Sequence, residues 1–331
     1  MSKVFSSLVV RKYTVFFSVL PLVSLMLWKG LRSNRENFAD NCARRFMPLR
    51  ERESSVFSIV ERINTSAQLQ HPYGHVVIAN FLPSDLLACV NYCFPAYERW
   101  LKVKNNRGKE RKTIGLEFGS FTAPAWLKEK ALSLFTPAES IFWESYNSII
   151  SHPLVTFAWV KKFEVVLKKR NFIKQNELNF TKMIHTGTIF PQYNLQLDSS
   201  RYAIKPHNDG GTTKVITILL YLPRQSESHS EHAGTLVLEE KLRRSVSSGI
   251  EYYDKTTDTV RVLDNTGDGD AGEKLYVVRG KGEYRSNSLL AFGICDKSWH
   301  AVPEQRMKER LLVSGFIIFS EEYITTTPGR C

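Results

Sequence analysis

The stretch Tyr202-Ala-Ile-Lys-Pro-His207-Asn-Asp209 places an imidazole and a carboxylate just before the apolar run 214–222, which has the pattern of a buried strand. In an extended chain residues i and i+2 point to the same side, so His207 and Asp209 can converge on one ion. Gly210-Gly211 follows directly and allows a tight turn. A second triplet of this type, His229-Ser-Glu231, lies in a polar stretch without a strand pattern, and we interpret it as a solvated loop.

A second segment supplies the remaining polar groups. His300 follows the apolar stretch 287–293, and Arg310 opens the apolar run 310–319. A guanidinium at the entry of an apolar strand needs a partner. Arg310 and Ser314 share a strand parity, and a planar fork with a hydroxyl suits the far carboxylate of a 2-oxo diacid. Two imidazoles and a carboxylate, for their part, are a ligand set for ferrous iron.

These residues carry a resemblance to a known family. The segments are Tyr202–Asp209, Ile218-Leu-Leu-Tyr-Leu-Pro223, Gly234-Thr-Leu236, and Ser298-Trp-His-Ala-Val302 with Arg310 and Ser314-Gly-Phe316. They resemble those of the 2-oxoglutarate/Fe(II)-dependent dioxygenases, nearest the prolyl-hydroxylase-like branch, over roughly residues 75–320. Two departures are an unusually long stretch between Asp209 and His300, and Asn208 where the family often has Thr.

The resemblance implies a double-stranded β-helix, or jelly-roll, core and a defined chemistry. His207, Asp209 and His300 would bind Fe(2+), and Arg310 would anchor 2-oxoglutarate, with Ser314, Tyr221 and Tyr202 as further contacts. Tyr193 is another candidate contact. The co-substrate and O2 would yield succinate and CO2 while a C–H bond of a protein side chain or a small molecule is hydroxylated. Ascorbate is a candidate further cofactor. Because the imidazoles must be neutral, activity should fall as the pH drops through histidine titration.

The pattern along the chain predicts a mainly β protein with helices before the strands. The 331 residues allow one large or two ordinary domains. We place an oxygenase domain at 71–331, with helical support at 82–152, the jelly-roll core at 154–320 and a surface insert at 240–285. The strands expected are 76–81, 154–167, 183–197, 201–207, 214–222, 234–239, 259–263, 274–279, 287–293 and 310–319. The basic stretch 102–113 is expected to be a mobile connection.

The N-terminus predicts a membrane anchor. Residues 13–28 carry no charge and follow a short tail at 1–12, which favours a single transmembrane helix that acts as an uncleaved signal anchor. Residues 29–70 are polar and basic and suggest a stem. The basic residues after the apolar segment favour a cytosolic body. The sequons at Asn64 and Asn179 favour an ER or Golgi lumenal body, which we prefer, and organelle targeting is a further alternative.

The basic charge does not indicate nucleic acid. The formal net charge is +12, and the first 53 residues hold ten basic and four acidic residues around the apolar segment. This clustering fits a membrane-proximal stretch, so no nucleic acid partner is expected. The five cysteines form no even, closely spaced framework, and we interpret Cys89 and Cys93 as core or surface residues rather than zinc ligands.

Alternatives remain at this stage for the function and for two of the motifs. An N-terminal anchor, a basic stem and the pair Asp268 and Asp270 are typical of a Golgi-type glycosyltransferase that holds a metal and a sugar nucleotide. The same glycine-rich acidic stretch also fits a solvated turn. A jelly-roll could also be a binding module without activity. Arg310 could instead form a surface ion pair with Glu304 or Glu309.

Overall fold

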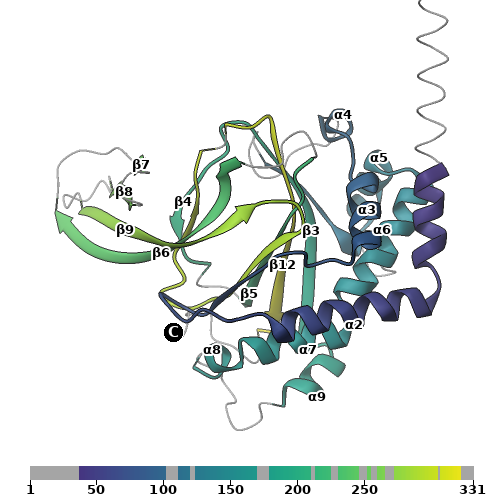
Figure 1. The fold of residues 1–331 in the computed structure, drawn as a ribbon, viewed down its shortest axis with the longest axis horizontal. Helices are drawn as coiled ribbons and strands as arrows, with labels where there is room; N and C mark the ends of the chain where they lie inside the picture. The colour runs from purple at the N-terminus through teal and green to yellow at the C-terminus, as the bar shows by residue number, and fades with distance from the viewer. Residues whose placement is uncertain are drawn as a thin grey trace, which may run out of the picture.

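The computed structural model describes ten stretches of the chain. They are residues 37–101, 111–119, 124–169, 179–209, 213–224, 230–245, 252–254, 259–264, 272–304 and 306–321. Two six-stranded antiparallel sheets dominate these stretches, and helices cover one of them (Figure 1). This arrangement is consistent with the jelly-roll core expected from the sequence.

The larger sheet has the strand order β1-β10-β5-β12-β3-β2. Its strands are β1 (His75–Ile78), β10 (Ser288–Gly293), β5 (Lys214–Tyr221), β12 (Glu309–Phe319), β3 (Ile189–Ser199) and β2 (Arg111–Gly115). The central strand β12 is apolar along nearly its whole length and is buried on both faces, as its continuous hydrophobic run predicts. Strands β5, β10 and β12 therefore match the strands expected from the sequence closely.

The smaller sheet has the order β4-β11-β6-β9-β8-β7. Its strands are β4 (Ile204–His207), β11 (His300–Val302), β6 (Ser230–Ser245), β9 (Gly272–Tyr284), β8 (Thr259–Asp264) and β7 (Tyr252–Asp254). Strands β6 and β9 form the long ribbon that extends away from the helices in Figure 1. The predicted insert 240–285 thus contributes strands that widen this sheet, at least in its described parts, and is not a simple loop.

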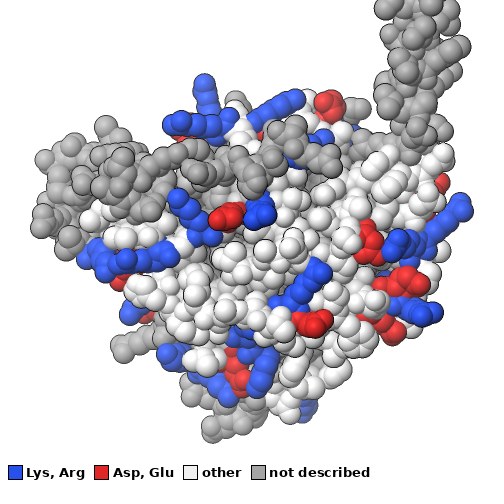
Figure 2. Space-filling model, viewed as in Figure 1, with Lys and Arg blue, Asp and Glu red and all other residues white. Residues whose placement is uncertain are grey.

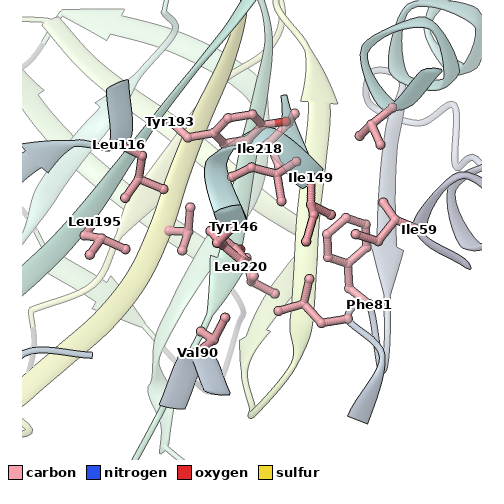
Figure 3. Packing of buried hydrophobic residues seen from close by; sticks show 14 of the residues in the cluster. Ile59, Phe81, Val90, Leu116, Tyr146, Ile149, Tyr193, Leu195, Ile218 and Leu220 are labelled. Atoms are coloured by element: carbon pink, nitrogen blue, oxygen red, sulfur yellow. The ribbon is translucent and has the colours of Figure 1, made fainter. Parts of the chain in front are cut away.

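The helices pack on the outer face of the larger sheet (Figure 1). They are α2 (Leu49–Thr65), α3 (Ser84–Cys93), α4 (Tyr97–Leu101), α5 (Ala125–Leu134), α6 (Pro137–Ile150), α7 (Pro153–Lys162), α8 (Glu164–Lys168) and α9 (Phe180–His185), with a 3-10 turn at Leu116–Gly119. Figure 3 shows Ile218 and Leu220 of the sheet packed beside Tyr146 and Ile149 of α6. Each such side chain contributes about 1.5–3 kcal/mol when fully buried. This core fixes one face of the sheet and leaves the other face to the site.

Two segments differ from their sequence-based expectation. Residues 154–167 form helices α7 and α8 and not a strand, because Pro153 begins a helix whose buried residues Val155 and Trp159 recur at helical spacing. Part of the expected stem is also helical, at 37–46 and in α2, and is packed on the core. Its buried residues are Ala39, Cys42, Ala43, Phe46, Val56, Ile59 and Ile63. Charged residues between them hide this helical period.

Two smaller differences concern the site and the cysteines. The expected mobile connection 102–113 ends in strand β2, so Arg111 is fixed in the sheet, and residues 102–110 lie outside the described residues. Cys89 is a buried core residue, and it forms a disulfide with Cys42 that the sequence analysis did not predict. Cys295 is disulfide-bonded as well. The 47-residue separation of Cys42 and Cys89 explains why spacing gave no signal.

Among the described residues, the surface charges show no single large basic patch in the view of Figure 2, and the expected membrane anchor lies outside this part of the chain. On the face seen in Figure 2, Lys and Arg lie in several separate groups, many of them beside Asp or Glu. Residues 1–36, which contain the predicted anchor 13–28, lie outside the described residues. Within the part that the structure describes, every helix is too short or too polar to span a bilayer.

Candidate iron and 2-oxo acid site

Two short strands of the smaller sheet bring the predicted metal ligands together. His207 ends β4 and His300 begins β11, and the two residues are direct partners in the antiparallel register. Their rings lie 4.1 Å apart between centroids. Asp209 follows β4 by two residues, on the side that the i, i+2 rule predicts. The structure therefore unites three residues that span more than ninety positions of the sequence.

The separations between ligand atoms fit a common metal ion. Nε2 of His207 lies 3.6 Å from Oδ1 of Asp209, and Nε2 of His300 lies 3.8 Å from its Oδ2. One ligand atom from each residue can be chosen so that all three lie within 4.8 Å of one another. Atoms bound at about 2.1 Å to one ion lie about 3 to 4 Å apart. The geometry therefore allows one ion to bind all three side chains.

Backbone carbonyls fix both imidazoles in the state that binds metal. Nδ1 of His207 lies 2.8 Å from the carbonyl oxygen of Lys205, and Nδ1 of His300 lies 3.0 Å from that of Ser298. A carbonyl oxygen only accepts, so each Nδ1 carries the proton and donates it. Each Nε2 of the neutral ring then keeps its lone pair and faces the carboxylate. This is the usual support of a metal-bound histidine.

Burial and charge favour the same protonation states. Burial lowers the pKa of His300 to about 4, although the neighbouring Asp209 acts in the opposite direction. Burial by itself would raise the pKa of Asp209, but His300, a hydrogen bond from Thr217 and His207 together lower it. The Thr217 hydroxyl donates to Oδ2 of Asp209 at 2.8 Å. At neutral pH His300 is thus a neutral ligand and Asp209 an ionised one.

A cavity of about 400 Å³ connects this cluster with Arg310. It lies between the inner face of the larger sheet and the smaller sheet. Its lining includes the three metal-ligand candidates, Thr217, Thr235, Arg310, Ser314, Arg111, Lys130, Lys214, Gln192, Asn194, Gln196, Leu219, Leu312 and Phe316. Both Arg310 and Ser314 face the cavity, as their shared parity predicts. A small diacid can therefore reach the metal ligands and the guanidinium from one space.

Arg310 is held deep in this cavity by three hydrogen bonds. Its Nε donates to the carbonyl of Ala233 at 2.6 Å, and Nη2 donates to the Thr235 hydroxyl at 3.1 Å. Its Nη1 donates to Asp198 at 2.8 Å, and both side chains are buried. The predicted alternative of a surface pair between Arg310 and Glu309 is wrong, because Glu309 pairs with Arg224 instead.

The three tyrosine candidates lie in three different places. Tyr221 is fully buried, and its ring lies 5.4 Å from the Arg310 guanidinium carbon. Burial raises its pKa, which the nearby Arg310 and Thr235 partly offset. Tyr202 packs its ring against the Arg111 guanidinium at 4.2 Å. Tyr193 has the opposite parity on β3 and points into the helix-covered core (Figure 3). Of these three tyrosines, Tyr221 is thus the one that packs beside Arg310, and Tyr193 lies on the far side of the sheet.

Among the polar residues around the cavity that sequence analysis missed, four belong to the hydrogen-bond networks of Asp209 and Arg310. They are Thr217, Thr235, Asp198 and Arg111. The parity of Thr217 within its strand was a usable signal, because it is the polar residue in the apolar run before Tyr221. Asp198 and Arg111 could not be found in this way, because only the strand register places them beside Arg310.

Several sequence-based candidates lie outside the described residues. These are Asp268 and Asp270 of the glycosyltransferase alternative, His229 of the second triplet, and Gly210-Gly211. Glu304 is described, is exposed and is not among the cavity-lining residues.

Comparisons with known proteins give structural but no sequence matches. No protein-family model matches the chain, and no curated protein matches it. A prolyl-4-hydroxylase from Pseudomonas putida aligns at 12% identity and a TM-score of 0.37, over 80% of this chain and 99% of that one. The dioxygenase for auxin oxidation 1 from Arabidopsis thaliana, in complex with 2-oxoglutarate, aligns at 14% identity and 0.40, over 81% and 88%.

A prolyl hydroxylase from Trichoplax adhaerens, in complex with a peptide of the hypoxia inducible factor oxygen degradation domain, aligns at 12% identity and a TM-score of 0.39, over 83% of this chain and 93% of that one. Two of these three structures are prolyl hydroxylases and one is a dioxygenase. With TM-scores below 0.5, the alignments decide no residue role in this chain.

Proposed function

We propose that the chain is an Fe(II)- and 2-oxoglutarate-dependent dioxygenase that hydroxylates a protein side chain, in the manner of a prolyl hydroxylase, or a small molecule. The observation that carries this proposal is one cavity with a His207-Asp209-His300 cluster and a buried Arg310. Two imidazoles and a carboxylate would hold ferrous iron here, and the shared cavity would give a 2-oxo acid access to both the iron and Arg310.

The proposal gives the residues of the site separate roles. His207, Asp209 and His300 would hold the iron, with Lys205 and Ser298 carbonyls fixing the two rings. The bound iron would supply the redox chemistry that couples decarboxylation of 2-oxoglutarate, to succinate and CO2, with hydroxylation of a C–H bond. Arg310 would bind the far carboxylate and so orient the 2-oxo end toward the metal ligands. Ser314, Tyr221 and Tyr202 are proposed as further contacts or supports at that end.

Succinate formation without added substrate tests the proposal. The wild-type protein with Fe(II), 2-oxoglutarate and ascorbate should release succinate slowly. His207→Ala and Asp209→Ala should abolish this turnover, while Arg310→Ala should raise the 2-oxoglutarate requirement. Full succinate production by all three variants would exclude the assignment. UDP-sugar hydrolysis that depends on Asp268 and Asp270 would support the glycosyltransferase alternative instead.

We further propose that the body of the protein lies in the lumen of the ER or Golgi, anchored through residues 13–28. The Cys42–Cys89 disulfide supports this, because such bonds persist in oxidising compartments. Asn64 and Asn179, the two sequon asparagines, are both exposed. Expression in a secretory host should yield a glycosidase-sensitive mass that Asn64→Gln and Asn179→Gln reduce stepwise. A protein without glycan and with free thiols at Cys42 and Cys89 would contradict this placement.

A further inference from the structure

Three charged side chains form a row across the larger sheet, at the end of the cavity away from the metal ligands. Asp198 of β3 is the direct partner of Arg310 on β12 and of Arg111 on β2. Directly opposed residues of an antiparallel sheet point to the same face. The two guanidiniums therefore flank one carboxylate.

Hydrogen bonds satisfy this carboxylate completely. Arg111 donates from Nε to Oδ1 at 2.7 Å and from Nη2 to Oδ2 at 3.0 Å. Arg310 donates from Nη1 to Oδ2 at 2.8 Å. The Gln196 amide lies 3.1 Å from each oxygen and completes the set. Asp198 is fully buried, so it cannot turn to solvent and remains a fixed charge between the two guanidiniums.

The row carries more positive than negative charge. Two guanidiniums face one carboxylate, which leaves a net charge of +1 at a place where Arg310 is 1% exposed and Arg111 is 19% exposed. Among the described residues, both guanidiniums form their ion pairs with Asp198 alone. A buried charge without a counter-charge is unfavourable. One further carboxylate entering the cavity would remove the imbalance.

We propose that Arg111 is a second guanidinium of the diacid anchor, and that Asp198 sets the net charge of the anchor to match a single carboxylate. The inference deepens the proposed function and rests on it. The Tyr202 ring against Arg111 holds the guanidinium in place, which gives this tyrosine a supporting role. Asp198 neutralises part of the positive charge of the two arginines. The site therefore selects a single carboxylate group over a dianionic group such as inorganic phosphate.

Calorimetric binding to the Mn(II)-loaded full-length protein tests this without turnover. The two ligands are 2-oxoglutarate and 2-oxopentanoate, which has the same carbon chain but lacks the far carboxylate. Their affinity ratio isolates the contribution of the anchor. Wild type should prefer 2-oxoglutarate by about 10- to 100-fold, the range expected for hydrogen bonds to a charged group.

The decisive variants change the charge of the row by known amounts. Arg111→Gln leaves a neutral row and should lower the affinity for 2-oxoglutarate by about tenfold, with 2-oxopentanoate affected less than about twofold. The double variant Arg111→Gln/Asp198→Asn restores the +1 charge and should recover most of the lost preference. Arg279→Gln is the matched control, because Arg279 forms an ion pair with Glu239 on the smaller sheet outside the cavity.

The outcomes separate the two proposals. If wild type binds 2-oxoglutarate with the expected preference and Arg111→Gln binds it equally well, Arg111 is no part of the anchor and the inference fails alone. Equal weakening of both ligands would assign Arg111 a merely structural role and overturn its part in the anchor. A double variant as weak as Arg111→Gln would show that the net charge of the row does not set the affinity, and would overturn the role given to Asp198. If Mn(II)-loaded wild type has no preference for 2-oxoglutarate, the proposed function fails together with the inference.

Discussion

The two ends of the cavity are built differently. At the metal end, short strands β4 and β11 present their terminal residues, and the His207 side chain is 35% exposed. At the anchor end, Arg310 is the second residue of the long central strand β12 and is 1% exposed. In the proposed function, the open end lets a substrate approach the metal ligands, while the sealed end shields the ion pair of Arg310 and Asp198 from bulk solvent. The proposed function thus places chemistry and recognition at different ends of one cavity.

Removal of a metal ligand should have the largest effect and should act on the open end alone. Asp209→Ala removes the carboxylate that faces both imidazoles, so Mn(II) affinity should fall by more than about 100-fold, beyond the loss expected for a supporting residue. Calorimetry of the metal-free protein measures this. His185→Ala, at an exposed histidine of α9, is the control. An Asp209→Ala protein that binds Mn(II) as wild type does would remove the metal site from its proposed place.

Arg310→Ala should affect the sealed end. The apparent Michaelis constant for 2-oxoglutarate should rise by roughly 10- to 150-fold, because a charged hydrogen bond is worth about 1.5–3 kcal/mol. The variant should also unfold more easily, by about 3 kcal/mol, since the buried Asp198 loses one of its two guanidinium partners. Mn(II) affinity should stay within about twofold of wild type. A parallel loss of metal affinity would show that the two ends are not separate.

Two threonines offer a sharper comparison, because the same substitution can be made at each end. Thr217 donates to Asp209 and the Thr235 hydroxyl accepts from Arg310. Thr217→Val should weaken Mn(II) binding by about tenfold, as loss of a supporting hydrogen bond does. Thr235→Val should instead weaken 2-oxoglutarate binding by up to about tenfold. Each measurement is the control for the other, and interchanged effects would contradict the assignment of the ends.

The smallest expected effect lies away from both ends. Thr136 and Glu139 form a capping box at the start of α6, on the helical side of the larger sheet. Thr136→Ala should lower the free energy of unfolding by about 1 kcal/mol, measured by urea denaturation. Neither Mn(II) nor 2-oxoglutarate affinity should change in the folded protein. If either affinity does fall, stability losses at a distance perturb the site and the interpretation of the other variants must include them.

The difference between the two ends also explains what the sequence could predict. The candidate metal ligands could be proposed from the sequence because His207 and Asp209 form a local motif and His300 follows a recognisable strand. Arg310 and Ser314 could be found by parity within one strand. Asp198 and Arg111 could not, because their role depends on which strands pair and in which register, and no local pattern encodes that. The same limit applies to the Cys42–Cys89 disulfide.

The fold shows a related limit. The apolar runs of β5, β10 and β12 predicted those strands, since a continuous hydrophobic run bounded by polar turns is typical of a buried strand. Residues 154–167 are as rich in β-branched and aromatic side chains, yet they form α7 and α8. Pro153 at the helix start and the helical spacing of Val155 and Trp159 indicate the helix there, although the β propensity of single residues favours a strand.

The most direct test of the central claim asks whether both ends hold one and the same ligand. Calorimetry should compare 2-oxoglutarate binding to the Mn(II)-loaded and the metal-free wild-type protein. If the ligand spans from the metal to Arg310, it should bind at one site and at least about tenfold more tightly when the metal is present. Equal affinity with and without metal, or no binding at all, would contradict a shared site in this cavity.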